Sequence, residues 1–457
     1  MRQYSISNSR IAAGRICIFR PSEPCGSEEG GIYIGRSLIY RLPFFLDASR
    51  LVNPHITVVG MSGSGKSYML RSIIIRERVY CNAKIFVLDW NGEYRSTIEF
   101  LGGKVHLVGR ECRIGIQSLE GGERSVEFLA EAAASTLRLG SEKLGEVKAE
   151  IMELLDTPKS GEATGRTKES VMRDKESNSI RSRLHELHPE RLFSTRGLAL
   201  ENLFEGVESI DLSIAESDLQ RELVVNFLMR MLVEYMHSRS IGASKTLLVV
   251  LDEAWRAVEE AQLVQRLYRE GRKYGVSVVT ATQHIGDVDR GILSNSASIF
   301  IFRLQGDDRL KDLSDSGLLK GVNIQNLAEM KTGMCLARIL YRDGYVGSFF
   351  IDRIDGFSTE TMWLSVGGKM RIEIPIERIE SAAGRLGISY KTVEGMKEFI
   401  ESRERKLSLV ELTRHMLSEG LDRPTIVAFL RLLGIEDMQI IKAYENAKDY
   451  RLELKKP

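Results

Sequence analysis

The chain has 457 residues, of which 43% are hydrophobic and 28% charged, as in an ordinary globular protein. This length exceeds what one hydrophobic core organises and predicts about two to four domains. The formal net charge is only +1, which excludes a protein that attracts nucleic acid through its overall charge. Any binding of nucleic acid must therefore depend on a local patch or on a ring that focuses charge.

The five cysteines are scattered and odd in number, and none has zinc-type C-x-x-C spacing. This pattern argues against a disulfide framework or a zinc site and fits a reducing compartment. The first fifteen residues lack the apolar run of a signal peptide, and no apolar stretch reaches the roughly 18 residues of a membrane span. We therefore expect a cytoplasmic protein, which would have to be recruited if it works at a membrane.

Residues 1–50 are rich in glycine, turns and β-branched residues and predict a small β domain. From residue 51 onward, strand-like runs alternate with helical patterns. This alternation predicts an α/β fold with a mostly parallel sheet, formed by residues 51–120 and 206–358. The strand candidates are "HITVVG" at 55–60, "AKIFVLDW" at 83–90, "KTLLVVLDEA" at 245–254, "VSVVTATQ" at 276–283 and "ASIFIFRL" at 297–304.

The predicted core is interrupted by residues 121–205, which read as a helical insertion. Within it, the polar segment near 156–180 predicts a mobile loop. Ser217 and Gln220 have capping-box spacing, and they begin a long helix that we expect to reach about His237.

The segment after the core begins with a hairpin, which we expect to turn at Asp343-Gly344. Residues 359–400 then form a linking β/α segment, and residues 401–457 form a tail of three amphipathic helices. The helix signals of the tail are a capping box and two glycine C-caps, at Ser408, Glu411, Gly420 and Gly434. This tail fits a helix-turn-helix-like DNA reader, an interaction bundle or a latch between subunits.

A glycine-rich loop, "GMSGSGKS" at 60–67, lies between a predicted strand and a predicted helix. This is the pattern of a P-loop, in which backbone N–H groups and the helix dipole bind the phosphates of ATP. Lys66 would pair with the β- and γ-phosphates, and the Ser67 hydroxyl would bind Mg²⁺. The predicted nucleotide-binding residues are Gly60, Ser62, Gly63, Ser64, Gly65, Lys66, Ser67 and Tyr68.

Two adjacent carboxylates, Asp252 and Glu253, end the apolar run at 247–251. Ligands of open α/β sheets bind at this end of the strands. We therefore predict that Asp252 joins Ser67 in the magnesium shell and that Glu253 is the catalytic base that polarises water. The alternative is a solvated strand end, which a neighbouring P-loop makes the weaker interpretation.

The next strand candidate, at 276–283, ends in Gln283. If it lies between the P-loop strand and the Asp252 strand, Gln283 reaches the γ-phosphate and orients the attacking water. At the other end of this strand, Arg266, Arg269 and Arg272 are spaced by three, near one face of a helix. They cannot easily reach the phosphates of their own chain. In a ring, Arg272, or Arg269 as second choice, would instead contact the nucleotide of the next subunit.

Four segments resemble, in their order, the HerA/FtsK superfamily of ring-forming DNA motors, and above all the archaeal HerA helicases. They are "NPHITVVGMSGSGKS", "VLDWNGEY", "LDEAWR" and "REGRKYGVSVVTATQ". The resemblance implies a RecA-like P-loop core and a homo-hexamer that hydrolyses ATP with Mg²⁺ between subunits. It also implies movement of double-stranded DNA through the ring, a role in DNA repair or end processing, and a nuclease partner. It further implies that the β domain of residues 1–50 is barrel-like.

Other features of the sequence leave alternatives open. Trp255 resembles the aromatic residue of conjugation and type IV secretion ATPases, so a motor of that type is the second hypothesis. A nucleotide-dependent switch is a third, against which the presence of both Glu253 and Gln283 argues. Asp89 and Glu93 would either position the nucleotide or stabilise the sheet edge.

Overall fold

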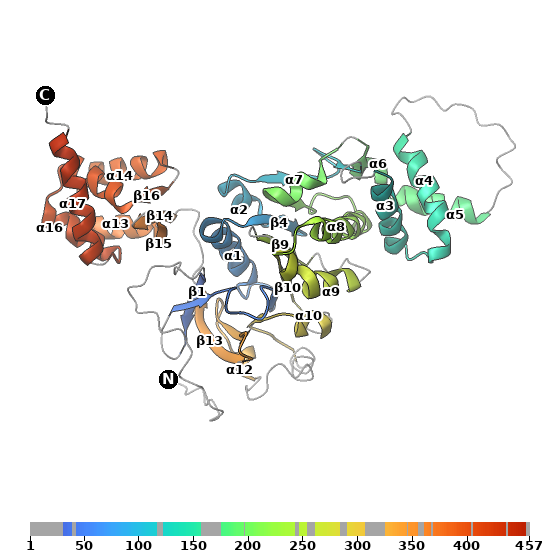
Figure 1. Ribbon diagram of the computed structural model, residues 1–457, viewed down its shortest axis with the longest axis horizontal. Coiled ribbons are helices and arrows are strands. Elements are labelled where there is room, and N and C mark those ends of the chain that lie inside the picture. Colours follow the sequence, from blue (N-terminus) through green and yellow to red (C-terminus); the bar gives the residue numbers. More distant parts are fainter. Residues whose placement is uncertain are drawn as a thin grey trace. The chain divides into compact units, whose positions relative to one another are not determined.

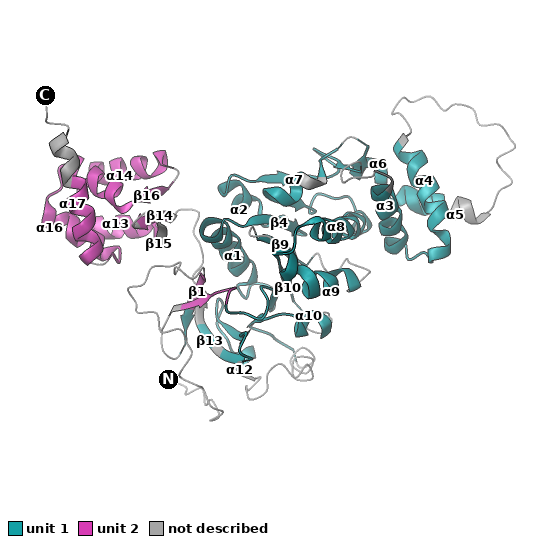
Figure 2. Ribbon diagram, in the orientation of Figure 1, with its two compact units in different colours: residues 1–12, 36–40, 50–354 teal, residues 13–35, 41–49, 355–457 magenta. Residues whose placement is uncertain are grey.

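The computed structural model describes residues 31–38, 43–116, 122–156, 175–195, 197–242, 246–253, 261–283, 290–306, 325–344, 346–354, 361–366, 369–403, 405–435 and 437–453. The chain forms two compact units (Figures 1 and 2). Unit 1 is built mainly from Arg50–Ile354 and unit 2 mainly from Asp355–Pro457.

A long sheet forms the centre of unit 1, and nine of its eleven strands follow the order β13-β12-β11-β3-β10-β9-β4-β8-β5. All strands from β11 to β5 run parallel, and β12 and β13 are antiparallel. The predicted α/β class with a mostly parallel sheet is therefore confirmed. The strands are β3 (Ile56–Val59), β4 (Lys84–Asp89), β5 (Lys104–His106), β8 (Val207–Asp211), β9 (Leu247–Asp252), β10 (Val276–Thr282), β11 (Ser298–Phe302), β12 (Cys335–Leu340) and β13 (Val346–Ile354).

The central strands are apolar along their whole length because helices cover the sheet. Every residue of β9 and β10 is buried, as expected of parallel strands with both faces covered. Helix α1 packs against β4 and β9, while α9 packs against β10 (Figure 1). The core helices are α1 (Lys66–Cys81), α2 (Arg95–Phe100), α7 (Leu200–Glu205), α8 (Asp218–Ser238), α9 (Ala261–Glu270), the 3-10 turn η4 (Gly271–Tyr274), α10 (Arg290–Ser294) and α12 (Gln325–Ala328).

Helices also fill the region predicted as an insertion. Helix α3 packs against α8 and α4, and α4 packs against α5. Helix α5 already begins at Lys175, and residues 157–174 of the predicted mobile loop lie outside the described residues. The elements here are β6 (Ile114–Gly115), α3 (Gly122–Thr136), the 3-10 turn η1 (Ser141–Lys143), α4 (Leu144–Asp156), α5 (Lys175–Leu187), α6 (Pro189–Leu192) and β7 (Phe193–Ser194).

Two local features predicted for unit 1 can be compared with the structure, a hairpin turn and a capping box. The hairpin β12–β13 turns at Asp343-Gly344, where Gly344 has a φ of 81°. At the start of α8, the Ser217 hydroxyl accepts a hydrogen bond from the Gln220 N–H. The Gln220 side chain, however, accepts from the N–H of Glu216 instead of that of Ser217. The predicted capping box is therefore only half formed.

Unit 2 contains a three-stranded sheet and a helical bundle with its own apolar core. Ser408 and Glu411 form the predicted capping box, and Gly420 and Gly434 have the positive φ of helix C-caps. Its elements are β14 (Thr361–Val366), β15 (Lys369–Pro375), β16 (Lys406–Ser408), α13 (Ile376–Arg385), α14 (Tyr390–Ser402), α15 (Leu409–Ser418), α16 (Arg423–Leu432) and α17 (Asp437–Glu453).

The first fifty residues contribute two neighbouring strands, β1 (Ile32–Ser37) and β2 (Pro43–Leu46). Residues 1–30 and 39–42 lie outside the described residues, so the separate β domain stays a prediction. Among the helices in the described part of the chain, none is long and apolar enough to cross a membrane.

Candidate active site

The P-loop connects the end of β3 to the start of α1. The Gly60 N–H donates to the carbonyl of Thr282 (3.1 Å), and the Met61 N–H donates to the carbonyl of Arg303 (3.0 Å). The loop is thus held between the ends of β10 and β11. Gly65 precedes α1 with a φ of 114°, a backbone conformation that residues other than glycine rarely adopt.

Close packing explains why glycine is needed at two positions of the loop. A Cβ on Gly60 would lie 2.5 Å from the Cβ of Phe302, and a Cβ on Gly65 would lie 3.2 Å from the Cα of Gly333. Gly333 precedes β12, and its N–H donates to the carbonyl of Ser64 (2.9 Å). No local pattern predicts this support by Gly333, because the contact joins segments almost 270 residues apart.

The polar groups of the loop fit a bound phosphate. Lys66 is buried, and its Nζ donates to the carbonyls of Gly60 (2.6 Å) and Met61 (3.2 Å). The Oγ of Ser64 is buried without a hydrogen-bond partner among the described residues, which is costly unless a ligand provides one. Ser67 lies in the first turn of α1 and is half-buried.

The strand order brings the predicted catalytic side chains to one edge of the sheet. β10 pairs with β3 on one side and with β9 on the other, as predicted. In this register, Ala281 lies opposite Asp252, so Gln283 follows β10 at the same edge as the P-loop. Glu253 is buried with a φ of 58°, a left-handed conformation that costs roughly 1–3 kcal/mol in a non-glycine residue.

A row of three aspartates crosses this edge of the sheet. Asp89 on β4 pairs in register with Asp252 on β9 and with Asp211 on β8. The two oxygens of Asp89 accept hydrogen bonds from the N–H groups of Glu93 (3.0 Å) and Tyr94 (2.8 Å). The hydroxyl of Tyr94, fully buried, then donates to Oδ2 of Asp252 (2.7 Å). Asp89 therefore positions Tyr94, which in turn positions Asp252.

The electrostatics of this row follow from burial. Burial raises the pKa of Asp252 to about 6, and the negative charges of Glu253 and Glu93 add to the shift. The Tyr94 hydrogen bond and the positive charge of Lys66 oppose it. Burial also raises the pKa of Asp89 and holds that of Tyr94 well above its usual value. A divalent cation beside Asp252 would favour its ionised form.

The predicted arginines lie at the opposite edge of the sheet, before β10 begins. Arg266 and Arg269 are exposed on α9, whereas Arg272 belongs to the turn η4 and so does not share their helix. The guanidinium of Arg272 is exposed and donates to the carbonyl of Val52 (2.5 Å). These side chains are therefore not brought together with the P-loop of their own chain.

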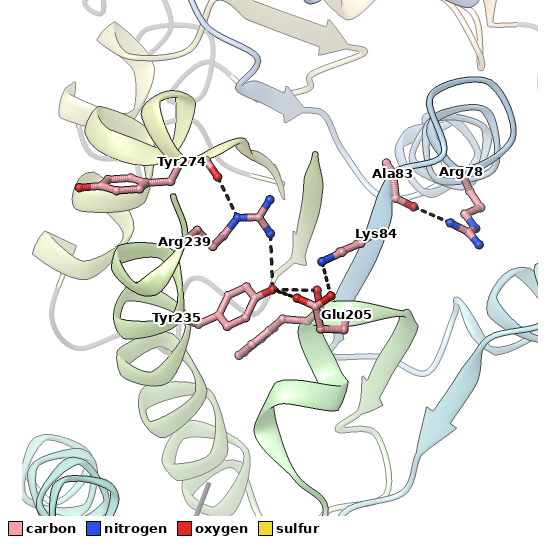
Figure 3. A network of polar contacts seen from close by, with 8 residues as sticks. Arg78, Ala83, Lys84, Glu205, Tyr235, Arg239 and Tyr274 are labelled. Carbon is pink, nitrogen blue, oxygen red and sulfur yellow. Dashed lines mark hydrogen bonds and ion pairs between the residues drawn. The ribbon is translucent and has the colours of Figure 1, made fainter. Parts of the chain in front are cut away.

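A polar network fixes the turn that carries Arg272 (Figure 3). Nε of Arg239, just after α8, donates to the carbonyl of Tyr274 (2.8 Å), and another nitrogen of Arg239 donates to the hydroxyl of Tyr235 (3.5 Å). Glu205 accepts from Tyr235 and pairs with Lys84 at the start of β4. Burial and the hydrogen bond to Glu205 together raise the pKa of Tyr235 to about 12.

Trp255, which follows Glu253 by two residues, lies outside the described residues. Tyr94, Asp211 and Gly333 were missing from the predicted site. Tyr94 was within a recognised segment, and the Gly-Glu-Tyr sequence after Asp89 was the only local signal for it.

Comparison with known proteins places the central region in a family. Residues 32–232 match the family "Helicase HerA, central domain". The chain is 26% identical over 330 residues to the DNA double-strand break repair helicase HerA of Sulfurisphaera tokodaii, covering 67% of this chain and 66% of that protein. It is 23% identical over 279 residues to the DNA import protein CedB of Sulfolobus acidocaldarius, covering 56% and 45%. The matched region thus spans less than two thirds of either relative.

Two solved structures share the fold. VirB4 of Thermoanaerobacter pseudethanolicus is similar with a TM-score of 0.54 at 18% identity, covering 73% of this chain and 98% of that one. The plasmid coupling protein TrwB, in complex with ADP and Mg²⁺, has a TM-score of 0.50 at 13% identity, covering 71% and 91%. The predicted resemblance is therefore confirmed: residues 32–232 are similar to the central domain of HerA helicases, and the chain is similar in sequence to an archaeal HerA protein.

Proposed function

We propose that this chain is an ATP-hydrolysing motor of the HerA type, which assembles into a hexameric ring and moves double-stranded DNA. One observation carries the proposal. Lys66, Asp252, Glu253 and Gln283 meet at one edge of the sheet, whereas Arg272 is exposed at the other. A site divided in this way is complete only where two subunits meet.

Each side chain has a role that its position supports. Lys66 and the N–H groups of the P-loop bind the β- and γ-phosphates, and the oxygens of Ser67 and Asp252 would hold Mg²⁺. When bound, this ion supplies positive charge beside the phosphates. Gln283 orients the attacking water, and Glu253 accepts its proton.

The proposal is tested first by ATP hydrolysis with and without linear duplex DNA, run beside a native mass measurement. We expect hydrolysis that DNA stimulates and a mass of six chains. If the rate of ATP hydrolysis is the same with and without DNA and the protein never forms a ring, the motor is ruled out. Turnover far below one per minute even with DNA would favour a nucleotide-dependent switch.

The division of the site between subunits is tested by mixing two inactive variants. Arg272→Ala and Lys66→Ala proteins, each inactive alone, are co-assembled and the mixed rings verified by mass. Some interfaces then combine an intact Lys66 with an intact Arg272, so activity should return. Arg269→Ala, mixed in the same way, shows whether the neighbouring arginine contributes. Verified mixed rings without activity would count against an arginine that acts across the interface.

A second candidate function is a motor that drives DNA across a membrane. The similarity to a DNA import protein favours it, and the shared fold of VirB4 and TrwB is compatible with it. Purification of the tagged chain from its native cells separates the two candidates. A nuclease that co-purifies supports DNA end processing, whereas a membrane complex that is lost when residues 1–50 are deleted supports transport.

A further inference from the structure

An open, polar cleft lies in unit 1, away from the candidate active site. Its volume is about 420 Å³, within the size range of ligand sites. It is formed by the turn after β5, by the end of α6, and by the end of β7 with the residue that follows it. Its lining includes three arginines, one carboxylate and two hydroxyls, from Arg110, Arg113, Arg191, Glu111, Ser194 and Thr195.

The backbone beneath the cleft is firmly held. The short strands β6 and β7 pair in parallel, the N–H of Ile116 donates to the carbonyl of Ser194 (3.0 Å), and the N–H of Leu198 donates to that of Arg113 (2.8 Å). A Cβ on Gly197 would lie 2.4 Å from the Arg113 carbonyl oxygen, so these segments are in close contact. Phe193 packs on Phe227 of α8 with 5.0 Å between ring centroids. The backbone segments that carry the arginines are thus held together by hydrogen bonds and close packing.

The three guanidinium groups differ in how far their charge is satisfied. Arg191 forms an ion pair with both oxygens of Glu216 (2.7 and 2.9 Å). Among the described residues, the guanidinium of Arg113 donates only to a neutral acceptor, the carbonyl of Glu190 (3.3 Å). The side chain of Arg110 is exposed and makes no hydrogen bond or ion pair with any described residue. Arg110 and Arg113 are therefore available to an anionic ligand.

The cleft is separate from the nucleotide site but shares its edge of the sheet. The turn with Arg110 follows the carboxyl end of β5, just as the P-loop follows that of β3. Five strand spacings separate β3 from β5, which at about 4.8 Å each amounts to about 24 Å. A nucleotide on Lys66 does not bridge this distance, so a ligand of the cleft would be a different molecule.

We propose that this cleft is a binding site for the phosphodiester backbone of double-stranded DNA, with Arg110 and Arg113 as its main contacts. The inference rests on the proposed function and adds to it a point where the DNA is held. Guanidinium groups match the oxygens of phosphates, and hydroxyls such as those of Ser194 and Thr195 are common further donors. Arg191 is paired with a carboxylate, whereas Arg110 and Arg113 can each bind a phosphate. Contacts of this kind position DNA without reading its sequence.

The test measures binding of a fluorescent duplex to the full chain by anisotropy, across a series of salt concentrations. Arg110→Ala and Arg113→Ala are compared with Lys104→Ala. Lys104 is an exposed residue on β5 that does not line the cleft, so its loss removes one positive charge nearby. Unfolding midpoints and ATP hydrolysis without DNA are expected to stay unchanged in all three variants, because none of these residues touches the nucleotide site.

We expect each arginine variant to weaken binding several-fold for every duplex sequence and to reduce the salt slope by about 1. Lys104→Ala should bind as the wild type does. Arginine variants that match Lys104→Ala in affinity and slope, while the wild type binds duplex, would overturn the cleft and leave the motor intact. Tighter binding of polyglutamate than of duplex, with the same dependence on arginine, would assign the cleft to an acidic protein instead. A wild-type chain that binds no duplex would overturn both proposals.

Discussion

The hydroxyl of Tyr94 donates a hydrogen bond of 2.7 Å to Oδ2 of Asp252, although 158 residues separate them in sequence. The N–H of the same tyrosine is held by Asp89. The Gly-Glu-Tyr segment after β4 therefore links two neighbouring strands at the residue that is the expected magnesium ligand. Of the two roles considered for Asp89, this geometry favours an indirect one, in which Asp89 orients the residue that orients Asp252.

Replacement of Tyr94 by phenylalanine tests this link. Tyr94→Phe keeps the buried ring and removes only the hydroxyl, so Asp252 loses a partner that favours its charged form. We expect roughly 10-fold weaker hydrolysis, as is usual when the partner of a metal ligand is removed. Because the pKa of Asp252 rises further, the acid limb of the pH profile should also move to higher pH and the Mg²⁺ requirement should increase.

The matched control is Tyr235→Phe, which removes another buried tyrosine hydroxyl but one that contacts Glu205 at the opposite edge of the sheet. It should leave the pH profile and the Mg²⁺ requirement unchanged. If Tyr94→Phe and Tyr235→Phe give the same profile as the wild type, the hydroxyl of Tyr94 has no part in positioning Asp252.

Asp252 itself should make the protein less stable at neutral pH. Its folded pKa of about 6 lies above its usual 3.8, so the folded state binds the proton more tightly. The stabilisation by that proton is complete below about pH 4 and is lost as pH rises through 6, a difference of about 3 kcal/mol. Asp252→Asn, which stays neutral, should therefore abolish hydrolysis yet unfold at a higher temperature than the wild type at pH 8. Equal midpoints at pH 8, measured without nucleotide, would contradict this.

The sequence predicted those parts of the site that depend on local patterns. The glycines at 60–65, the apolar strands and the carboxylates after β9 each carry their signal within about ten residues. Tyr94, Asp211 and Gly333 do not, because their roles depend on which strands become neighbours and in which register. The half-formed capping box at Ser217 shows the same limit on a smaller scale. The Gln220 side chain accepts from the N–H of Glu216, one residue before the N–H that the box requires.

The network around Arg239 offers a test of how the arginine turn is held. Arg239→Met removes the hydrogen bond to the carbonyl of Tyr274 while keeping an unbranched side chain as long as the stem of arginine up to Nε. With the turn less fixed, Arg272 should be misplaced, and kcat should fall by roughly 10-fold. The KM for ATP should change little, because the P-loop lies at the opposite edge of the sheet.

Arg78→Met is the control for this substitution. Arg78 also donates to a backbone carbonyl, that of Ala83 at 3.3 Å, but it does not contact the turn (Figure 3). A wild-type kcat is expected for it. An Arg239→Met protein with unchanged kcat would indicate that the turn is held well enough by its other contacts, such as that of Arg272 with Val52.

His55, which precedes β3, should make the fold sensitive to acid. It is fully buried, its ring lies 4.9 Å from that of Tyr268, and its Nδ1 accepts a hydrogen bond from the N–H of Val278 (3.2 Å). Burial lowers its pKa to about 3, and a hydrogen bond with the Tyr268 backbone offsets this only in part. Below about pH 6.5 the unfolded chain therefore takes up a proton that the folded chain does not. Stability should fall between pH 6.5 and 3, by up to about 1.4 kcal/mol per unit.

The test compares unfolding midpoints across this pH range for the wild type and His55→Asn. The Oδ1 of asparagine can replace Nδ1 as the acceptor for Val278 but does not titrate, so the loss of stability should be less steep in the variant. The control is His185→Asn, since His185 is exposed on α5 and meets water in both states. It should keep the wild-type profile. If His55→Asn loses stability as steeply as the wild type, the acid sensitivity must come from other groups, because the proton taken up on unfolding is then not that of His55.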